Sequence, residues 1–312
     1  MNVEDLTLIL KVAQCRSIKL AAAKLDMRTA TASAAIKRVE ASLGCELFIR
    51  TTRHLKLSVA GERYIPQCEK ALIVLENAKQ NIKSENDEIK GELRIALSSD
   101  LGRNIVSPWI DDLIDKHPKL TLRAHLSDSN IDFYRDSVDI ALRYGSPNDA
   151  NVYGFKICNV PRLLCATKQY LLEHGEPTHP DELTSHEGLF YQLNDIINNT
   201  WEFTDTVTHY KVKMQGRRAS NDGDLVRRWC LAGKGLAIKS ALDIADDLLN
   251  DNVVSVMKDY QHIEGELWLI CPSRQSITPA VRLLRDECRA RSYHLLNKLV
   301  RKGVLNKSVL TY

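Results

Sequence analysis

Residues 17–44 read SIKLAAAKLDMRTATASAAIKRVEASLG, and this stretch decides the fold of the N-terminal region. Ser17 is a favoured N-cap for a short helix whose apolar residues recur at helical spacing. Those residues are Leu20, Ala21 and Leu25. Residues 26–28 break the pattern, and a second helix follows that ends at Gly44. Its apolar face consists of Ala32, Ile36, Val39 and Leu43. Two short helices joined by so tight a turn predict a helix-turn-helix.

The opposite face of this second helix is polar and contains small residues. It presents Thr29, Ala30, Thr31, Ser33, Ala34, Lys37 and Arg38. Short hydroxyl side chains can hydrogen-bond base edges, a threonine methyl can meet a thymine methyl, and the two cations are placed for phosphates. The alternative is an ordinary solvated helix face. The order of the motifs along the chain favours a DNA-reading helix.

Flanking segments complete an all-α head with a wing. An earlier amphipathic helix is predicted from Leu6, Ile9, Leu10 and Ala13. After the reading helix, residues 46–57 (ELFIRTTRHLKL) predict two short strands around a basic tip. Residues 1–57 carry ten Lys/Arg and five Asp/Glu, whereas the whole chain has a net charge of only +3. A basic head on a near-neutral body fits a module that binds a polyanion.

The order of these residues resembles the winged helix-turn-helix of LysR-type transcriptional regulators. The matching stretches are Ser17-x3-Ala21-Ala22-x2-Leu25, Ser33-x2-Ile36-x2-Val39-Glu40-x2-Leu43-Gly44-x2-Leu47-Phe48-x-Arg50-Thr51-Thr52-Arg53, and Ala60-Gly61-Glu62. The resemblance implies a sequence-specific regulator of transcription that binds double-stranded DNA. The helix that ends at Gly44, the third of the head, would enter the major groove. It also implies backbone contacts from the wing, at Arg50, Thr52 and Arg53. The chain departs from the family at Arg28, Thr29 and Ala34, where a cap, Gln and Arg are common. These departures favour readout of DNA shape over bidentate base contacts.

A linker helix is predicted over residues 59–88. Its apolar residues follow a 3–4 alternation and form one stripe. They are Ile65, Cys68, Leu72, Leu75 and Ile82. We expect this stripe to pair with a second copy of the chain, and the resemblance implies a dimer too, with a tetramer as a dimer of dimers. The alternative is packing against the helix's own chain.

Beyond residue 91 the pattern changes to alternating strands and helices, which predicts an α/β domain with a mainly parallel sheet. Strands are expected at 93–97, 120–126, 138–143, 236–238 and 266–271. The resemblance implies an effector domain over 91–291, similar to periplasmic solute-binding proteins, with lobe I at 91–160 and 266–291 and lobe II at 161–265. Residues 292–312 are expected to form a basic C-terminal extension. The fold class is therefore α/β overall, with an all-α winged head and a long linker helix.

A small-molecule effector would lie between the two lobes. The resemblance places it near Ser98, Ser99, Arg143, Asn221 and Asp222. Ser98, Ser99 and Asn221 stand before predicted helices, whose free N–H groups can hold an anion, and Arg143 could add a charge-assisted bond. The alternative is that these residues are plain helix caps. Because Asp100 and Asp222 would repel a carboxylate, the charge of the effector stays open.

Composition and motifs exclude several other classes of protein. The chain is 44% hydrophobic and 27% charged, as in an ordinary globular protein. We found no G-x-S-x-G, P-loop, H-E-x-x-H or G-x-G-x-x-G motif, so we expect no enzyme, catalytic residue, cofactor or metal. The eight cysteines lack metal or redox spacing and are expected as reduced, buried thiols. With no signal peptide or apolar span of membrane length, a cytoplasmic protein without a membrane partner is expected.

Two alternatives to an effector-responsive regulator stay open at this point. A periplasmic binding protein is disfavoured by the basic head. A DNA-binding regulator whose rear domain only oligomerises, and binds no ligand, is the alternative that the sequence does not exclude. RNA polymerase is a candidate further partner of either kind of regulator.

Overall fold

The computed structural model describes residues 2–50, 55–83, 89–129, 133, 136, 138–147, 152–193, 196–205, 207–262 and 265–310, without the side chains of Arg50, Ile73 and 76–83. The chain divides into two compact units, Met1–Asn86 and Asp87–Tyr312, and each is described by itself. No helix within the described ranges has the length and apolar character needed to cross a bilayer.

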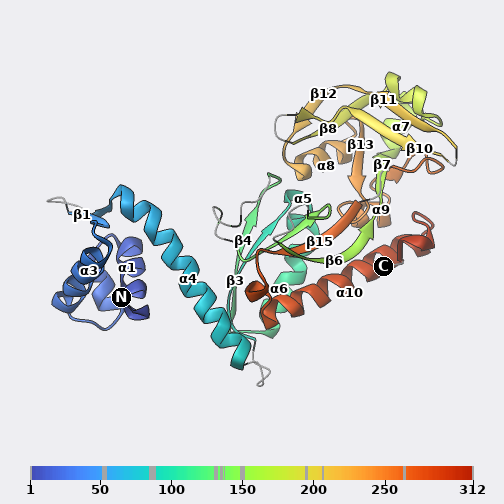
Figure 1. Cartoon of the computed structure of the whole chain (residues 1–312). Coiled ribbons are helices and arrows are strands. Elements are labelled where there is room, and N and C mark those ends of the chain that lie inside the picture. Colours follow the sequence, from blue (N-terminus) through green and yellow to red (C-terminus); the bar gives the residue numbers. More distant parts are fainter. Residues whose placement is uncertain are drawn as a thin grey trace. The chain divides into compact units, whose positions relative to one another are not determined.

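The first unit is a winged helical head followed by a long helix (Figure 1). Its elements are α1 (Val3–Cys15), α2 (Ile18–Lys24), α3 (Thr29–Leu43), β1 (Phe48–Arg50), β2 (Leu55–Leu57) and α4 (Val59–Lys83). Ser17 caps α2 by accepting a hydrogen bond from the Leu20 amide, and Gly44 ends α3 with a left-handed φ of 69°. These local signals are the ones that the sequence analysis used, and the helix-turn-helix forms where it was predicted.

Small residues allow the helices of the head to pack closely. Ala21, Ala22, Ala32 and Ala35 are buried beside the larger side chains of one core. Two details differ from the prediction. Leu20 is 56% exposed rather than packed, and α1 buries Leu8 and Val12 more fully than the predicted Leu10. Helix α1 is therefore rotated slightly from the expected face.

The linker helix α4 is fixed to the head through a glycine. A Cβ added to Gly61 would lie 2.2 Å from the carbonyl oxygen of Leu47, so only glycine allows this approach. Ser58 helps to hold the same junction, because its amide donates to the Leu47 carbonyl (2.9 Å). Glu40 accepts hydrogen bonds from the Leu47 and Phe48 amides (2.8 and 3.2 Å), which ties α3 to the wing.

The second unit contains two α/β lobes, each built on its own sheet (Figure 1). The five-stranded sheet of lobe I has the order β4-β3-β5-β15-β6, and the sheet of lobe II has the order β12-β8-β13-β7-β14, with β9 paired to β8. The strands of lobe I are β3 (Gly91–Leu97), β4 (Leu120–Leu126), β5 (Ile140–Tyr144), β6 (Tyr153–Val160) and β15 (Gly265–Cys271). Those of lobe II are β7 (Arg162–Ala166), β8 (Glu187–Leu193), β9 (Ile196–Ile197), β12 (Gln215–Ser220), β13 (Leu236–Ser240) and β14 (Val254–Ser255), beside a hairpin of β10 (Thr200–Thr204) and β11 (His209–Lys213).

Both sheets are mixed rather than mainly parallel. Strands β4, β3 and β5 are parallel, whereas β15 is antiparallel to both β5 and β6. Lobe II repeats this arrangement, with β12, β8 and β13 parallel and β7 antiparallel to β13 and β14. The chain passes from lobe I to lobe II between β6 and β7, and it returns between β14 and β15. These passages bring the ends of both sheets to one interlobe region.

Helices cover the sheets of both lobes. In lobe I they are α5 (Ser99–Leu101), the π-helical η1 (Gly102–Val106), α6 (Ser107–Lys116) and η3 (Arg274–Ser276). In lobe II they are α7 (Lys168–His174), η2 (Pro180–Ser185), α8 (Gly223–Leu231) and α9 (Ala245–Leu249). Helix α5 follows β3 after one residue and α8 follows β12 after two, so both begin at the carboxyl end of a strand.

The segment expected as a C-terminal extension from residue 292 is continuous with the helix that precedes it. Helix α10 runs without a break over Pro279–Arg301. Ser292, Leu296 and Leu299 are all buried, with Leu296 in the core of lobe I and Leu299 in a core of lobe II. A turn of 3-10 helix, η4 (Lys307–Leu310), adds further apolar contacts to lobe I. Lys298 and Arg301 therefore lie on a helix that packs against both lobes, whereas Lys302 is the C-cap of this helix and Lys307 begins η4.

Candidate functional sites

The outer face of α3 is open to solvent within the head. Thr29, Ala30, Thr31, Ala34, Lys37 and Arg38 are exposed, and Ser33 is half-buried. The opposite face, with Ala32, Ile36 and Val39, is buried in the core. The predicted reading residues therefore share one accessible face of one helix.

Arg38 has a partner inside the head. Its guanidinium pairs with the carboxylate of Asp5, which is 4% exposed and lies at the N-terminus of α1. Burial alone would raise the pKa of Asp5, but the Asn2 amide and Arg38 outweigh it, so that pKa is lowered. Arg38 thus ties α3 to α1, and Lys37 is the neighbouring cation that extends from the reading face.

The wing forms, although most of its basic tip lies outside the described residues. Strands β1 and β2 are antiparallel, with Phe48 opposite Leu57 and Arg50 opposite Leu55. Thr52, Arg53 and the side chain of Arg50 are outside the described part of the chain. Their expected contacts with the DNA backbone stay a prediction.

Two residues of the predicted pairing stripe on α4 belong to the head. Ile65 and Cys68 are 6% and 4% exposed and pack in the core formed by α1, α2 and α3. For these two residues the alternative of packing on the helix's own chain is correct, because the first turns of α4 cover the head. Further along, Leu72 is half-buried and Leu75 is 44% exposed, and the side chain of Ile82 lies outside the described residues.

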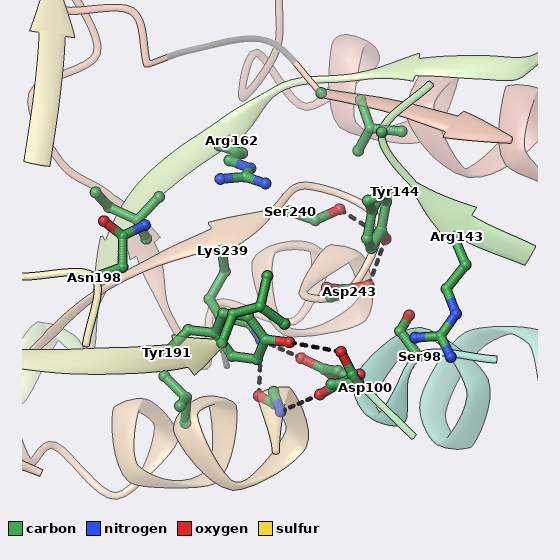
Figure 2. Close-up of a pocket in the computed structure, with 18 of the residues that line it drawn as sticks. Ser98, Asp100, Arg143, Tyr144, Arg162, Tyr191, Asn198, Lys239, Ser240 and Asp243 are labelled. Carbon is green, nitrogen blue, oxygen red and sulfur yellow. Dashed lines mark hydrogen bonds and ion pairs between the residues drawn. The ribbon is translucent and has the colours of Figure 1, made fainter. Parts of the chain in front are cut away.

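A cavity of about 870 Å³ lies between the lobes of the second unit (Figure 2). Lobe I contributes Ser98, Asp100, Asp128, Arg143 and Tyr144, and lobe II contributes Arg162, Tyr191, Asn198, Glu202, Lys239, Ser240, Asp243 and His262, among others. Cavities of this size bury small organic molecules. Polar groups from both lobes therefore line one cavity.

Only two of the five predicted effector residues line this cavity. They are Ser98 and Arg143. Ser99 is 3% exposed and bonded internally: its hydroxyl donates to Asp128 and accepts from the Gly223 amide (2.9 Å). Asn221 is exposed away from the lining. Asp222 also lies outside the lining: it caps α8 through the Asp224 and Leu225 amides (2.9 and 3.1 Å) and pairs with Arg103 (3.0 Å). For these three residues, contact with an effector stays a prediction.

A buried ion pair in the lining of the cavity links the two lobes. Lys239, at 7% exposure, pairs with Asp100, at 3%, and also donates to the Gly223 carbonyl oxygen (2.8 Å). Burial opposes the charge of Lys239, but Asp100 and Asp243 outweigh it and raise the lysine pKa. Burial raises the pKa of Asp100, and Lys239 offsets only part of that effect. Breaking such a pair by removing one partner would leave an isolated buried charge.

A second interlobe contact joins Tyr144 of lobe I to Asp243 of lobe II. The phenol donates to the Asp243 carboxylate and accepts from the Ser240 hydroxyl (2.9 Å). Burial, followed by the nearby charge of Asp100, raises the pKa of Asp243 to about 7. This carboxyl group therefore titrates near neutral pH while its own phenol partner holds it in place (Figure 2).

Several polar atoms that line the cavity lack a partner. Within the described residues, Nε and Nη2 of Arg143, Oγ of Ser98 and Nδ1 of His262 are buried and make no hydrogen bond. Burial lowers the pKa of Arg143 and, with Arg162 nearby, lowers that of His262 to about 4, so the imidazole is neutral at pH 7. In Figure 2 the Arg143 guanidinium lies beside Ser98. Unpaired buried donors are costly, and a ligand in the cavity would satisfy them.

Comparison with known proteins assigns this arrangement to a family. The model of the bacterial regulatory helix-turn-helix protein, lysR family, matches residues 3–62, and the model of the LysR substrate binding domain matches residues 86–292. The chain belongs to the LysR family: it is a DNA-binding transcription regulator with an effector-binding domain, and not an enzyme.

Individual relatives agree with this assignment. The chain is 27% identical over 279 residues to the HTH-type transcriptional regulator DmlR of Escherichia coli, covering 89% of this chain and 91% of that protein. It is 26% identical over 267 residues to the transcriptional activator TtdR of the same species, covering 86% of each. The full-length structure of the Vibrio cholerae virulence activator AphB matches with a TM-score of 0.57 and 25% identity over 93% of this chain and 99% of that one. CrgA of Neisseria meningitidis shares the fold, with a TM-score of 0.56 and 22% identity over 98% of this chain and 100% of that one.

Three polar residues of the lining, Lys239, Asp243 and Tyr144, were not among the effector residues predicted from the sequence. One signal was present: Lys239 interrupts the apolar run of residues 235–242, GLAIKSAL, where a buried lysine requires an acidic partner. No local pattern identifies Asp100 as that partner, since it lies in the other lobe.

Proposed function

We propose that the interlobe cavity binds a small organic anion and that this anion is the effector of the regulator. The observation that carries the proposal is that Nε and Nη2 of Arg143 and the hydroxyl of Ser98 are buried in the lining without a hydrogen-bond partner. An anionic ligand would form charge-assisted hydrogen bonds with both groups, which are stronger than bonds between neutral partners.

The remaining charges of the lining favour an anion. Four lining carboxylates have partners within the protein: Asp100 with Lys239, Asp128 with backbone amides, Asp243 with Tyr144, and Glu202 with Lys211. Lys239 is paired as well. In the described part of the chain, neither Arg143 nor Arg162 has an ion pair. The charged groups of the lining that are available to a ligand are therefore these two guanidinium groups, which are positive.

A thermal-shift screen tests this proposal in the full chain. The ligands would be sodium carboxylates and neutral amides of matched size, at constant ionic strength. At least one carboxylate should stabilise the effector domain, by about 2.7 kcal/mol at a hundredfold excess over its Kd. Arg143→Gln should abolish the shift, whereas Arg123→Gln, at an exposed arginine outside the cavity lining, should keep it. Stabilisation by neutral compounds alone, or a shift that survives Arg143→Gln, would show that Arg143 does not select the ligand.

We propose that α3 reads the major groove through Thr29, Thr31 and Ser33, with Ala30 and Ala34 allowing close approach. Lys37 would contact phosphate, and Arg38 would act mainly by holding α3 against α1. The exposed face of α3 supports this assignment, and Arg50, Thr52 and Arg53 of the wing would add backbone contacts. Proteins that use few bidentate contacts gain specificity from DNA shape.

We propose that the later part of α4 pairs with a second copy of the chain. Leu72 and Leu75 supply the exposed apolar stripe, with Ile82 as its continuation, whereas Ile65 and Cys68 are used within the head. A dimer would place two reading helices on two half-sites. A tetramer, a contact with RNA polymerase and a cytoplasmic location are part of the same proposal.

A further inference from the structure

A carboxylate of the chain itself sits between the starts of two helices in the second unit. Asp128 follows β4 in the turn Ser127–Asp128–Ser129, where the hydroxyls of Ser127 and Ser129 lie 2.6 Å apart. Oδ1 of Asp128 accepts from the Ser99 amide (2.6 Å), and Oδ2 accepts from the Gly223 amide (2.8 Å). The Ser99 hydroxyl also donates to Oδ2. One carboxylate thus receives hydrogen bonds from both lobes.

The two amides belong to the first residues of α5 in lobe I and α8 in lobe II. Helix α5 continues into η1 and α6, so the helical segment that begins at Ser99 extends to Lys116. Asp222, the N-cap of α8, takes the Asp224 and Leu225 amides and leaves the Gly223 amide for Asp128. Free N–H groups at helix starts favour negative charge, and here two such starts meet at one carboxylate.

The fit around this carboxylate is close. A Cβ added to Gly223 would lie 3.4 Å from Oδ2 of Asp128 and 3.5 Å from Oγ of Ser99. Tyr191 of lobe II donates from its hydroxyl to the backbone carbonyl of Asp128 (3.4 Å). The position is therefore a preformed anion-binding site, and a side chain of the protein itself occupies it.

We propose that Asp128 is an internal ligand that fills the anion site between the lobes and thereby determines which anions the cavity accepts. It joins α5 to α8 without any bound molecule, and its charge excludes a second carboxylate from the same amides. The effector's anionic group is then left to Arg143 and Ser98, a consequence that rests on the proposed function of the cavity. Asp128 is on this view a specificity-determining residue, and Ser99 is its positioning partner.

Chemical rescue in the full chain tests the proposal. All four tryptophans, Trp109, Trp201, Trp229 and Trp268, lie in the second unit, so their fluorescence follows the unfolding of the effector domain alone. Asp128→Ala should lower the Tm of this transition by about 4–8 °C, since a domain of this size shifts by roughly 2–4 °C per kcal/mol. Sodium acetate should recover about 3–5 °C in the variant, relative to sodium chloride of equal ionic strength, as expected at about tenfold excess over its Kd. Acetate should not stabilise the wild type at this site, where Asp128 already occupies it.

Two further variants serve as controls for charge and for the loss of an unrelated carboxylate. Asp128→Asn keeps the size of the side chain but removes its charge, so it should lower the Tm without creating room for acetate. Asp112→Ala, which removes an exposed carboxylate paired with Arg291, should show neither the large loss nor the rescue. If Asp128→Ala does not fold, an unchanged Tm in Asp128→Asn still overturns the proposal.

The outcomes separate this proposal from that for the effector. Equal stabilisation of wild type and Asp128→Ala by acetate, or no loss of Tm in Asp128→Ala, would overturn the role of Asp128. Adding Arg143→Gln to Asp128→Ala should leave acetate rescue intact, because the two sites use different donors. Failure of the carboxylate screen at Arg143 would leave this rescue unaffected.

Discussion

The pKa of Asp243 makes the stability of the effector domain depend on pH in a defined direction. This carboxyl group is 7% exposed, accepts from Tyr144, and has its pKa raised from 3.8 to about 7 by burial and by the charge of Asp100. The folded state therefore holds a proton at pH values where the unfolded state has released it. The stability contributed by Asp243 is fully present below about pH 4 and is lost as the pH rises toward 7.

The size of this effect follows from the shift. Each pKa unit corresponds to 1.36 kcal/mol, so a shift of about three units amounts to roughly 4 kcal/mol in total. About 3 kcal/mol of this would be lost between pH 5 and pH 8, or roughly 6–12 °C in Tm for a domain of this size. Asp243→Asn replaces the carboxyl group with a neutral group of similar shape that can still accept from Tyr144. It should match the wild type at pH 5 and exceed it in stability at pH 8.

Tryptophan fluorescence of the full chain, followed during heating at a series of pH values, measures this difference. Asp112→Asn, at an exposed carboxylate paired with Arg291, is the matched control and should leave the pH profile parallel to that of the wild type. If the profile of Asp243→Asn also stays parallel, then Asp243 does not carry the proton that the argument assigns to it. A variant less stable than wild type at every pH would refute the reasoning in the same way.

Three other predictions concern the first unit. Ser33→Glu places a charge on the reading face and should abolish operator footprinting without unfolding the head, whereas Ser42→Glu, exposed near the end of the same helix, should still footprint. Gly61→Ala inserts a Cβ 2.2 Å from the Leu47 carbonyl oxygen and should destabilise the head by about 1–3 kcal/mol in urea titrations, with Ala60→Ser unchanged. Leu72→Asp with Leu75→Asp should halve the mass measured by light scattering while the head stays folded, whereas Ile65→Asp should unfold the head; an unchanged mass in the double variant would place the subunit interface elsewhere.

The head could be predicted in detail because its signals are local. Ser17 accepts from an amide three residues away, and Gly44 takes the left-handed conformation that ends α3. The face of α3 that carries Ser33 is fixed by the helical period once Ala32, Ile36 and Val39 are buried. Such short-range constraints leave few alternatives, and the family resemblance added DNA binding to a fold that the pattern already indicated.

In the linker helix, the periodicity of the apolar residues predicts a buried face but not what covers it. A stripe at 3–4 spacing predicts that α4 buries one face, but it does not say against what. The first part, at Ile65 and Cys68, covers the head, and only the part from Leu72 onward is left for another chain. The same reasoning applies beyond residue 292, where Leu296 and Leu299 bury α10 against the lobes although the segment is rich in basic residues.

The ligand cavity was the least predictable part because its charge depends on pairing between distant residues. From the sequence, Asp100 and Asp222 stood against an anionic ligand. In the fold, Lys239 pairs with Asp100 and Arg103 pairs with Asp222, so neither carboxylate is left to repel one. The helix starts that follow Ser98 and Asn221 were expected to offer free amides to a ligand, yet Asp128 accepts from the amides of Ser99 and Gly223. A ligand can bind only to polar groups that have no partner within the protein. Among the groups discussed here, these are the guanidinium nitrogens Nε and Nη2 of Arg143 and the hydroxyl of Ser98. Local sequence can identify the charges, but only the tertiary contacts determine which of them are left unpaired.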